Sequence, residues 1–305
     1  MSQRPKFTLV QLQYFLAAAE AGSMTAAAQS LHVAQSAIST AVTNLERSLR
    51  LQLFIRHHAR GLTLTADGDL FLRQARNLLL QAAEVANCAA DVGSAAAGRI
   101  TVGCFTTLAP FHLPRLLADL ALEFPLLEVD IVEGETGFLQ AALHGGRCEL
   151  AVMYDLDLDP DFDRELLSVA PPYAILPPDH PIAAAGRGAW LKDLAKDPMV
   201  LLDLPHSRDY FRALVASSGV DPQVRYRTAG YETVRALVAR GHGFSILNQK
   251  PQADTTYDGG KVTVVPLLDK LAPLPIVLTR LRGLRLSARG EAFAARCRAV
   301  FRDRG

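Results

Sequence analysis

The apolar positions between residues 35 and 50 follow helical spacing. Ile38, Val42, Leu45 and Leu49 are separated by four, three and four residues, so they share one face of a predicted helix. The opposite face carries short polar side chains and one arginine, namely Ser36, Ser39, Thr40, Thr43 and Arg47. A helix with such a face is suited to the major groove of DNA, where these side chains can reach base edges and phosphates.

Two shorter helices are predicted before this one. The first covers residues 9–20, and Ser23 can cap a second over residues 24–31. Residues 32–34 then form a turn, and two short helices joined in this way make a helix-turn-helix whose second helix reads DNA. A plain helical hairpin in a bundle core has the same apolar pattern, so the pattern alone leaves both interpretations open.

Two short alternating runs follow the predicted reading helix and indicate a β-hairpin wing. Arg56 and Arg60 of this hairpin are placed to meet phosphate or the minor groove beside the reading helix. The adjacent His57 and His58 do not predict a metal site, because neighbouring residues of a strand point to opposite faces.

A long helix is predicted from Thr65 to about residue 93, with acidic residues in its first turn, where the helix dipole favours them. Its apolar residues recur at steps of four and three, the period of a coiled coil: Phe71, Ala75, Leu78, Ala82, Val85, Ala89 and Val92. Pairing with a second copy and packing on the helix's own domain both predict a helix. Only pairing requires the 3.5-residue period.

Residues 9–65 resemble the N-terminal domain of LysR-type transcriptional regulators. The resemblance rests on LQYFLAAAEAGSMTAAAQSLHVAQSAIS and LERSLRLQLFIRHHARGLTLTADG, which match the family without a gap. It implies an all-α winged helix-turn-helix domain over residues 1–65, which binds double-stranded promoter DNA, and a linker helix over residues 66–93, which pairs two subunits. Ala34 replaces the usual Ser or Thr cap, and Thr40-Ala41 replaces a basic or amide pair. The residues expected at the DNA are Gln35, Ser36, Ser39, Thr40, Thr43, Arg47, Arg56 and Arg60.

Charge is unevenly distributed along the chain. The net charge is +1, but residues 1–66 contain six basic and two acidic side chains, so they carry +4 and the remainder carries −3. A basic small domain on a mildly acidic body is expected of a DNA-binding module, and the modest excess predicts that two or more copies act together. No apolar run reaches membrane-span length and no secretory core opens the chain, so a cytoplasmic protein with no membrane contact is expected.

The four cysteines are far apart and form no C-x-x-C pair, so neither a disulfide nor a zinc site is predicted. Cys104 is either a redox sensor beside a cleft or, the interpretation we favour, a small core residue. The acids that alternate over residues 155–165 lack the glycine and final glutamate of an EF-hand, which favours a solvated edge over calcium. The eight arginines between residues 280 and 304 fit the polar face of an amphipathic helix better than a second nucleic-acid patch. No cofactor and no metal are predicted.

The pattern changes after the linker helix. Strand-like runs ITVGC, EVDIVEG and ELAVMY alternate with helices predicted over residues 113–123 and 137–144, which indicates a parallel sheet covered on both faces. A second unit has YAIL, PMVLL, QVRYRT and FSIL as strands, with helices over residues 207–217 and 231–240. PIVLTRL and a helix over residues 287–302 close the chain. Neither Gly-x-Gly-x-x-Gly nor a Walker lysine is present, so nucleotide binding has no support.

The segments GCFTTLAPFHLP, EGETGFLQAALHGGRCELAVMYD and ETVRALVARGHGFSIL resemble the periplasmic-binding-protein-like effector domain of the same family. The resemblance implies an α/β domain over residues 94–305 with two Rossmann-like subdomains, one of about 99–165 with 270–305 and one of about 166–269. It also implies a small-molecule effector between the subdomains, a homodimer or homotetramer, and RNA polymerase as a candidate partner.

Ligands of open α/β sheets bind beyond the carboxyl ends of the strands. Thr106 and Thr107 follow the first strand and Thr136 follows the second, so their hydroxyls and nearby helix N–H groups can hold a carboxylate. Arg208 can pair with an anion, and Tyr154, Phe105 and Tyr210 can form apolar walls. The predicted effector site comprises Thr106, Thr107, Thr136, Tyr154, Ser207, Arg208 and Thr233, each of which also fits a cap or core role. The expected effector is a small anionic metabolite.

An enzyme or a solute-binding module on the α/β body is the alternative function. The sequence has no Gly-x-Ser-x-Gly elbow, no His-Glu-x-x-His and no paired-carboxylate motif, so no catalytic residue is predicted. The resemblance likewise implies a regulator and not an enzyme.

Overall fold

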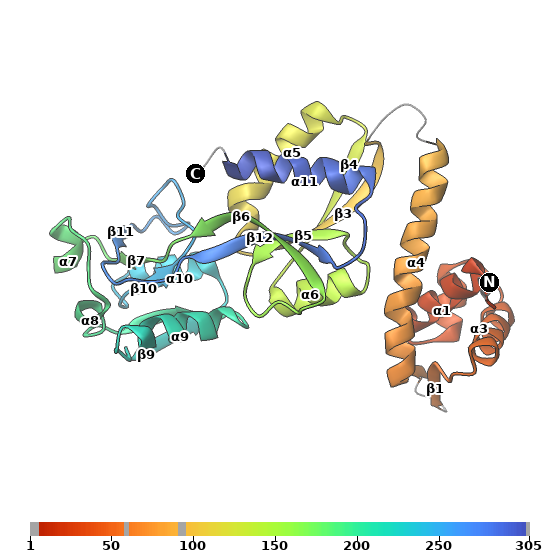
Figure 1. Cartoon of the computed structure of the whole chain (residues 1–305). Coiled ribbons are helices and arrows are strands. Elements are labelled where there is room, and N and C mark those ends of the chain that lie inside the picture. The colour runs from red at the N-terminus through yellow and green to blue at the C-terminus, as the bar shows by residue number, and fades with distance from the viewer. Residues whose placement is uncertain (1–5, 58–60, 91–95, 303–305) are drawn as a thin grey trace. The chain divides into compact units, whose positions relative to one another are not determined.

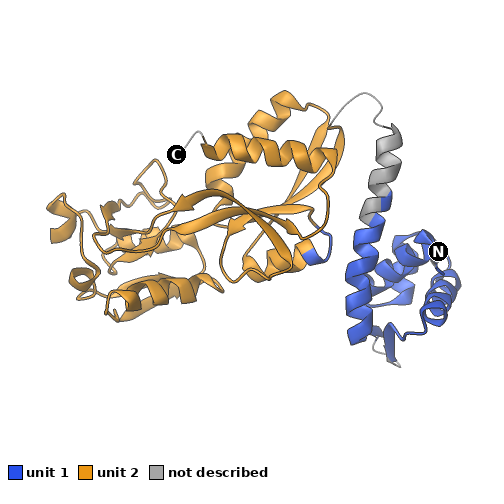
Figure 2. Cartoon of the chain, viewed as in Figure 1, with its two compact units in different colours: residues 1–95, 144–147 blue, residues 96–143, 148–305 orange. Residues whose placement is uncertain are grey.

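The computed structural model describes residues 6–57, 61–90 and 96–302. The chain divides into two compact units, residues 1–95 with 144–147 and residues 96–143 with 148–305 (Figure 2). No helix among the described residues combines the length and apolar character needed to cross a membrane. Within the same residues, His, Cys, Asp and Glu side chains do not gather in a metal-binding group.

Helices dominate the first unit (Figure 1). Along the chain come α1 (Leu9–Ala21), α2 (Met24–Ser30), α3 (Gln35–Leu49), the antiparallel hairpin of β1 (Phe54–His57) and β2 (Gly61–Leu64), and α4 (Ala66–Ala90). A turn of four residues separates α2 from α3. The predicted winged helix-turn-helix is therefore confirmed.

Side-chain caps define where α1 and α2 begin. The Thr8 hydroxyl accepts the Gln11 N–H at 3.2 Å, and the Gln11 side chain accepts the Thr8 N–H at 2.8 Å, which closes a capping box. The Ser23 hydroxyl accepts the Ala26 N–H at 3.3 Å at the start of α2, as predicted. Two of the first three helices thus have a cap that their sequence specifies locally.

The core of this unit uses the predicted faces. Ile38, Val42 and Leu45 of α3 are fully buried, and Leu49 is partly buried. In α1, the prediction placed Leu12, Phe15, Leu16 and Ala19 inward; the first two are fully buried and the others partly buried, while Ala18 is fully buried instead. The plain-hairpin interpretation loses its support, because β1, β2 and α4 also pack around this core.

The first turns of α4 pack on the core of the same unit. Phe71 lies edge-on to Phe7, with ring centroids 6.3 Å apart, and 5.4 Å from the Phe15 ring, and Ala75 is buried. Phe71 and Ala75 are the first two members of the predicted seam, so that end of the seam is used within the unit. Leu78, the third member, is 39% exposed. The side chains of the last seam positions, and the predicted helix end near residue 93, lie outside the described residues.

A mixed five-stranded sheet forms the first half of the second unit. Its strand order is β4-β3-β5-β12-β6, from β3 (Gly98–Phe105), β4 (Leu127–Gly134), β5 (Leu150–Tyr154), β6 (Phe162–Ala170) and β12 (Leu274–Leu281). β3 pairs in parallel with β4 and β5, but β12 pairs antiparallel with β5 and β6. The three strands that were predicted to form a parallel sheet therefore pair as predicted, and of the five strands β12 alone runs against the others. β5 and β6 run in the same direction, and β12 lies between them with the opposite direction as the chain returns from the second half of the unit.

Helices cover both faces of this sheet (Figure 1). α5 (Ala109–Glu123) and α11 (Ala288–Arg302) lie on one face and α6 (Thr136–His144) on the other. The His112 ring of α5 stacks on Phe301 of α11 with centroids 4.3 Å apart. Phe293 and Cys297 of α11 are fully buried, while Arg298 on its outer side pairs with Glu165 of β6 at 2.6 Å. The amphipathic-helix interpretation of the arginine-rich C-terminus is thus confirmed.

The second half of this unit is a smaller α/β layer. It contains β7 (Tyr173–Leu176), β8 (Met199–Leu202), β9 (Val224–Thr228), β10 (Ser245–Leu247) and β11 (Thr263–Pro266), with α7 (Pro181–Ala184), α8 (Leu191–Leu194), α9 (Ser207–Ser217) and α10 (Tyr231–Ala239). β7 pairs antiparallel with β10 and β11, and β8 pairs in parallel with β9. A parallel bridge between Met199 and Phe244 connects the two groups of strands. β6 and β12 lead into and out of this half.

Candidate DNA-reading surface and effector cavity

α3 carries a strip of small polar side chains on its outer face. Gln35, Ser36 and Thr40 are exposed, and Ser39 and Thr43 are partly buried. Arg47 in the last turn donates to the Asn44 side chain at 3.0 Å. Asn44 is exposed beside the predicted DNA-binding residues, and it was not among them although its amide suits base readout.

The start of α3 differs from the starts of α1 and α2. Ala34 occupies the N-cap position with extended backbone (φ −69°, ψ 138°), and no side chain caps the helix there. The first N–H groups of a helix carry partial positive charge and attract phosphate. This helix start is therefore suited to a DNA phosphate beside the outer face.

Glu46 fixes the hairpin against α3. Its carboxylate accepts the backbone N–H of Leu53 at 2.8 Å and that of Phe54 at 3.2 Å. Arg56 of β1 donates to the Thr43 hydroxyl at 3.1 Å and lies 3.8 Å from the Glu46 carboxylate. One arginine of the predicted wing is thus held beside the outer face of α3, while Arg60 lies outside the described residues.

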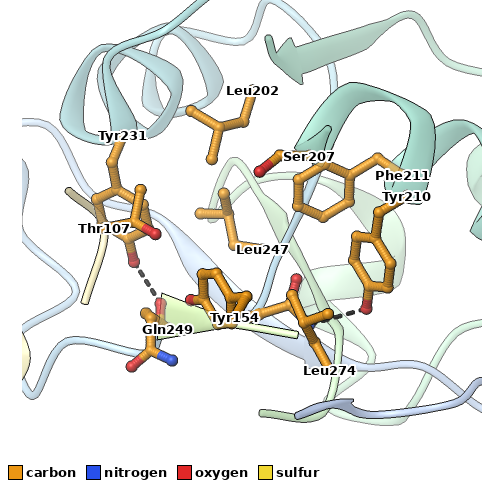
Figure 3. A pocket seen from close by; sticks show the side chains of 11 residues that line it. Thr107, Tyr154, Leu202, Ser207, Tyr210, Phe211, Tyr231, Leu247, Gln249 and Leu274 are labelled. Carbon is orange, nitrogen blue, oxygen red and sulfur yellow. Dashed lines mark hydrogen bonds between the residues drawn. The ribbon is translucent and has the colours of Figure 1, made fainter. Parts of the chain in front are cut away.

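A small cavity lies between the two halves of the second unit (Figure 3). It holds about 20 Å³, room for one water molecule. Its walls come from both halves: Thr107, Tyr154, Leu202, Ser207, Tyr210, Phe211, Tyr231, Leu247, Asn248, Gln249 and Leu274. Tyr231 and Thr107 lie on one side of it, and Tyr210, Phe211 and Ser207 lie on the opposite side.

Three predicted effector residues, Thr107, Tyr154 and Ser207, line this cavity together with Tyr210. Thr107 follows β3, and Tyr154 ends β5, so both stand at carboxyl ends of strands as expected. Ser207 is the first residue of α9 and is 5% exposed. Phe105, the other expected wall, is buried beneath Tyr154 with ring centroids 5.1 Å apart.

The other predicted effector residues lie outside the cavity wall. Thr106 donates its backbone N–H to Gly134 at 3.0 Å. Thr136 is fully buried at the start of α6, and its hydroxyl has no hydrogen-bond partner among the described residues. Arg208 pairs with Asp203, five residues earlier, and Thr233 of α10 does not line the cavity. Arg208 is thus committed to a carboxylate of the chain itself.

Gln249 organises one side of the cavity. Its backbone carbonyl accepts the hydroxyls of both Tyr173 and Tyr231, and its side-chain oxygen lies 3.3 Å from His112 Nε2 on α5. Neither Gln249 nor its neighbour Asn248 was predicted from the sequence. Both directly follow strand β10, which is the same signal that selected Thr107 after β3.

Burial further disfavours ionisation of the tyrosine hydroxyls in and beside the cavity. It raises the pKa of Tyr231 to about 12 and also raises the pKa values of Tyr154 and Tyr173. These side chains are therefore neutral hydrogen-bonding groups at physiological pH. Burial likewise raises the pKa of the Cys104 thiol, in line with the core role that we favoured for it.

These features define a class of protein: a winged helix-turn-helix, a helix that follows it, and an α/β unit with a cavity between two halves, which together make a DNA-binding protein with a ligand-binding module. Comparison with known families gives the same result. Residues 9–69 match the model described as bacterial regulatory helix-turn-helix protein, lysR family, and residues 93–302 match the LysR substrate binding domain. The chain belongs to the LysR family of bacterial transcriptional regulators.

Individual relatives agree with this assignment. The hydrogen peroxide-inducible genes activator of Dickeya chrysanthemi is 30% identical over 77% of this chain and 77% of its own length. The HTH-type transcriptional regulator CatR of Pseudomonas putida is 30% identical over 90% of this chain and 93% of its own length. The crystal structure of HinK, a LysR family regulator from Pseudomonas aeruginosa, superimposes with a TM-score of 0.64 at 37% identity and covers 97% of this chain and 98% of that chain. The named relatives are regulators and not enzymes.

Proposed function

We propose that this regulator binds promoter DNA through α3 and its wing, and that a small molecule in the cavity between the two halves of the α/β unit controls that binding. The observation that carries the proposal is the origin of the cavity walls, which come from both halves. A ligand in contact with both halves changes the free energy of their closure, and it therefore shifts the population of closed molecules.

For the DNA surface, we propose that α3 enters the major groove. Ser36, Ser39, Thr40 and Thr43 then face base edges, because they share the outer face of the helix. Gln35, Arg47, Arg56 and Arg60 complete the proposed set and meet phosphate or the adjoining minor groove. The contact of Arg56 with Thr43 supports this arrangement, since it joins the wing to the reading face.

For the assembly, we propose a homodimer or homotetramer in which α4 pairs with the same helix of a second copy. The net charge of +4 over residues 1–66 is small for a DNA-binding domain, so several copies acting together supply the affinity. Ligand-induced closure then changes the spacing of the reading helices and the bend of the DNA. The proposed domains remain residues 1–65, 66–93 and 94–305, and RNA polymerase remains a proposed partner.

For the signal, we propose a bound ligand and not the oxidation of a cysteine, although one relative carries the name of a peroxide-inducible activator. Peroxide reacts with exposed thiolates. Cys104, Cys148 and Cys297 are buried, and burial raises the pKa of Cys104 and Cys297, which disfavours the thiolate. The Cys88 side chain lies outside the described residues.

One pair of variants tests the two sites separately. Ser39→Glu adds a negative charge to the proposed reading face and should abolish specific binding to DNA from upstream of the protein's own gene. Gln13→Glu adds the same charge at an exposed position of α1 and should leave that binding nearly unchanged. Fluorescence anisotropy gives the affinity, and circular dichroism checks the fold. Equal binding by both variants would show that α3 is not the reading helix.

Thr107→Val removes a cavity hydroxyl at nearly constant volume. It should weaken the effect of a ligand on DNA binding without changing the binding of DNA alone. Thr279→Val is the matched control, because Thr279 is fully buried in β12 and does not line the cavity. A ligand response that both variants retain in full would place the effector elsewhere.

A further inference from the structure

The cavity wall carries no charged side chain among the described residues. Four of its eleven residues are aromatic, namely Tyr154, Tyr210, Phe211 and Tyr231, and three are leucines. The other four offer hydroxyl or amide groups. Flat aromatic ligands pack well against rings in such a wall, whereas an ionised ligand would lose its hydration without gaining a counter-charge.

Two arginines on the helices that border this wall already have partners. Arg208 is paired with Asp203, which directly follows β8. Arg235 of α10 is 4% exposed, pairs with Glu232 at 2.7 Å and donates to the Ala253 carbonyl at 2.9 Å. A carboxylate that entered the cavity would have to displace one of these internal carboxylates, and burying the displaced charge is unfavourable.

The helix starts around the cavity are also occupied. The Glu135 carboxylate accepts the N–H groups of Gly137 at 2.8 Å and Phe138 at 2.9 Å, so it fills the anion position at the start of α6. Pro110 in the first turn of α5 has no N–H to offer. The first two residues of α9 donate to backbone carbonyls of the preceding loop, and Glu232 already lies in the first turn of α10. Backbone N–H groups at helix starts hold carboxylates in other proteins, but around this cavity most of them are already bonded within the chain.

The Asn248 side chain favours a ligand that carries a hydrogen-bond donor. Its amide nitrogen donates to the Ala170 carbonyl at 2.9 Å and to the Tyr210 hydroxyl at 3.0 Å. A carbonyl oxygen can only accept, so this contact fixes which end of the amide is nitrogen. The side-chain oxygen of Asn248 is then buried and has no hydrogen-bond partner among the described residues. A buried acceptor of this kind favours a ligand that brings an N–H or O–H group.

We propose that the cavity takes an uncharged aromatic compound whose N–H or O–H group donates to the Asn248 side-chain oxygen, and that it discriminates against aromatic carboxylates. This proposal rests on the proposed function, and it replaces the anionic effector that the sequence led us to expect. The closed cavity is too small for an aromatic ring, so the halves part to admit the ligand. Entry separates Phe111 from Tyr231, whose ring centroids are 5.6 Å apart, and His112 from Gln249.

Matched pairs of compounds test the class of ligand. In each pair the two compounds share a ring and differ in charge. The first two pairs are benzamide with benzoate and 4-hydroxybenzamide with 4-hydroxybenzoate. Thermal melting of the full-length protein at pH 7.5 detects binding, and titration calorimetry gives the affinities. We expect the uncharged members to bind at least about tenfold more tightly. Equal or tighter binding of the carboxylates, or no binding across the whole set at millimolar concentration, overturns the proposal.

Two variants test the mechanism of discrimination. Asp203→Asn releases Arg208 from its pair, so it should raise the affinity for the carboxylate of each pair and leave that of the uncharged member within about twofold. Asn248→Leu should weaken the uncharged ligand about tenfold or more without improving the carboxylate. If Asn248→Leu fails to fold, Tyr210→Phe replaces it, because this change removes the hydroxyl that accepts from the Asn248 amide and keeps the shape of the ring. Unchanged affinities in these variants contradict the proposal.

A failure of the proposed ligand class can be distinguished from a failure of the proposed regulatory function. The same preparations are assayed for DNA binding by anisotropy, with and without each compound. DNA binding that responds to carboxylates overturns the proposed ligand class and leaves the regulator intact. Tight binding of an uncharged ligand with no effect on DNA binding supports the cavity chemistry and contradicts the proposed coupling between cavity and DNA.

Discussion

The uncapped start of α3 provides a test of how the reading helix is stabilised. α1 and α2 begin with side-chain caps at Thr8 and Ser23, whereas α3 begins at Ala34 without one. The Ala34 backbone already has the extended conformation that an N-cap requires, and the residue is exposed, so a serine hydroxyl fits without a clash. Ala34→Ser should therefore let the new hydroxyl accept an N–H of the first turn of α3.

The expected magnitude follows from the cost of losing such a cap. Replacing an N-cap Ser by Ala costs about 1 kcal/mol, with a range of about 0.5–2 kcal/mol, and the gain at residue 34 should be similar. For a unit of this size, about 1 kcal/mol raises the midpoint of thermal unfolding by about 4–8 °C. Ser23→Ala should lower the same midpoint by a comparable amount, because it removes an existing cap from the same unit.

Differential scanning calorimetry of the full-length protein gives the measurement. Ser23→Ala identifies the transition of the first unit, and Ala34→Ser should move that transition upward. Ala41→Ser is the control: it adds a serine inside α3, where the lower helix propensity should cost about 0.5 kcal/mol. If Ala34→Ser leaves the transition unmoved or lowers it while Ser23→Ala behaves as expected, then the missing cap does not limit the stability of α3.

Three further predictions concern the wing, the thiols and the tyrosines. Arg56→Ala should weaken binding about equally for all DNA sequences and reduce the slope of log affinity against log salt by about one, as measured by anisotropy over a salt series. The buried Cys104 should resist a thiol reagent in the folded protein at pH 8 and react once urea unfolds it, and peroxide should not change DNA affinity. The free energy of unfolding of the second unit should fall from pH 10 towards about 12, because the folded-state pKa of Tyr231 is raised to about 12 and that of Tyr173 is also raised.

Each of these predictions has an opposing outcome. An unchanged salt slope in Arg56→Ala would mean that Arg56 meets no phosphate. Rapid labelling of the folded protein at Cys104, seen by mass spectrometry, would contradict its burial. The tyrosine effect has a definite sign: protonated tyrosines contribute stability below pH 10, and unfolding releases their protons above it. A Tyr173→Phe, Tyr231→Phe double variant should therefore lose less stability at high pH than the parent.

Local signals were sufficient for the first unit. The four-three-four spacing of α3 identified Ile38, Val42 and Leu45 as core residues, because a helix fixes which positions share a face. Ser23 marked the start of α2 for the same reason, since a cap bonds to an N–H only three residues away. The seam of α4 was harder to assign. Phe71 fits a coiled coil by period, yet it packs on Phe15 of its own unit, and the period of a helix does not say which partner covers it.

The cavity depended on contacts between distant segments. The rule that ligands lie beyond strand ends selected Thr107 and Ser207, which line the cavity together with Tyr154, a predicted wall residue. The rule also selected Arg208, but it could not reveal that Arg208 forms an ion pair with Asp203. The same applies to Asn248, whose orientation depends on a carbonyl 78 residues earlier in the chain.

The sequence by itself determined the helices, their inward faces, most strands and the class of protein, because each of these rests on neighbours within a few residues or on a continuous motif. Only the tertiary structure decided the antiparallel course of β12 and the polarity of the cavity wall. Strand direction depends on how the chain returns from the second half of the unit. The charge of a site depends on which carboxylates meet which arginines across the fold, and neither of these is encoded in local spacing.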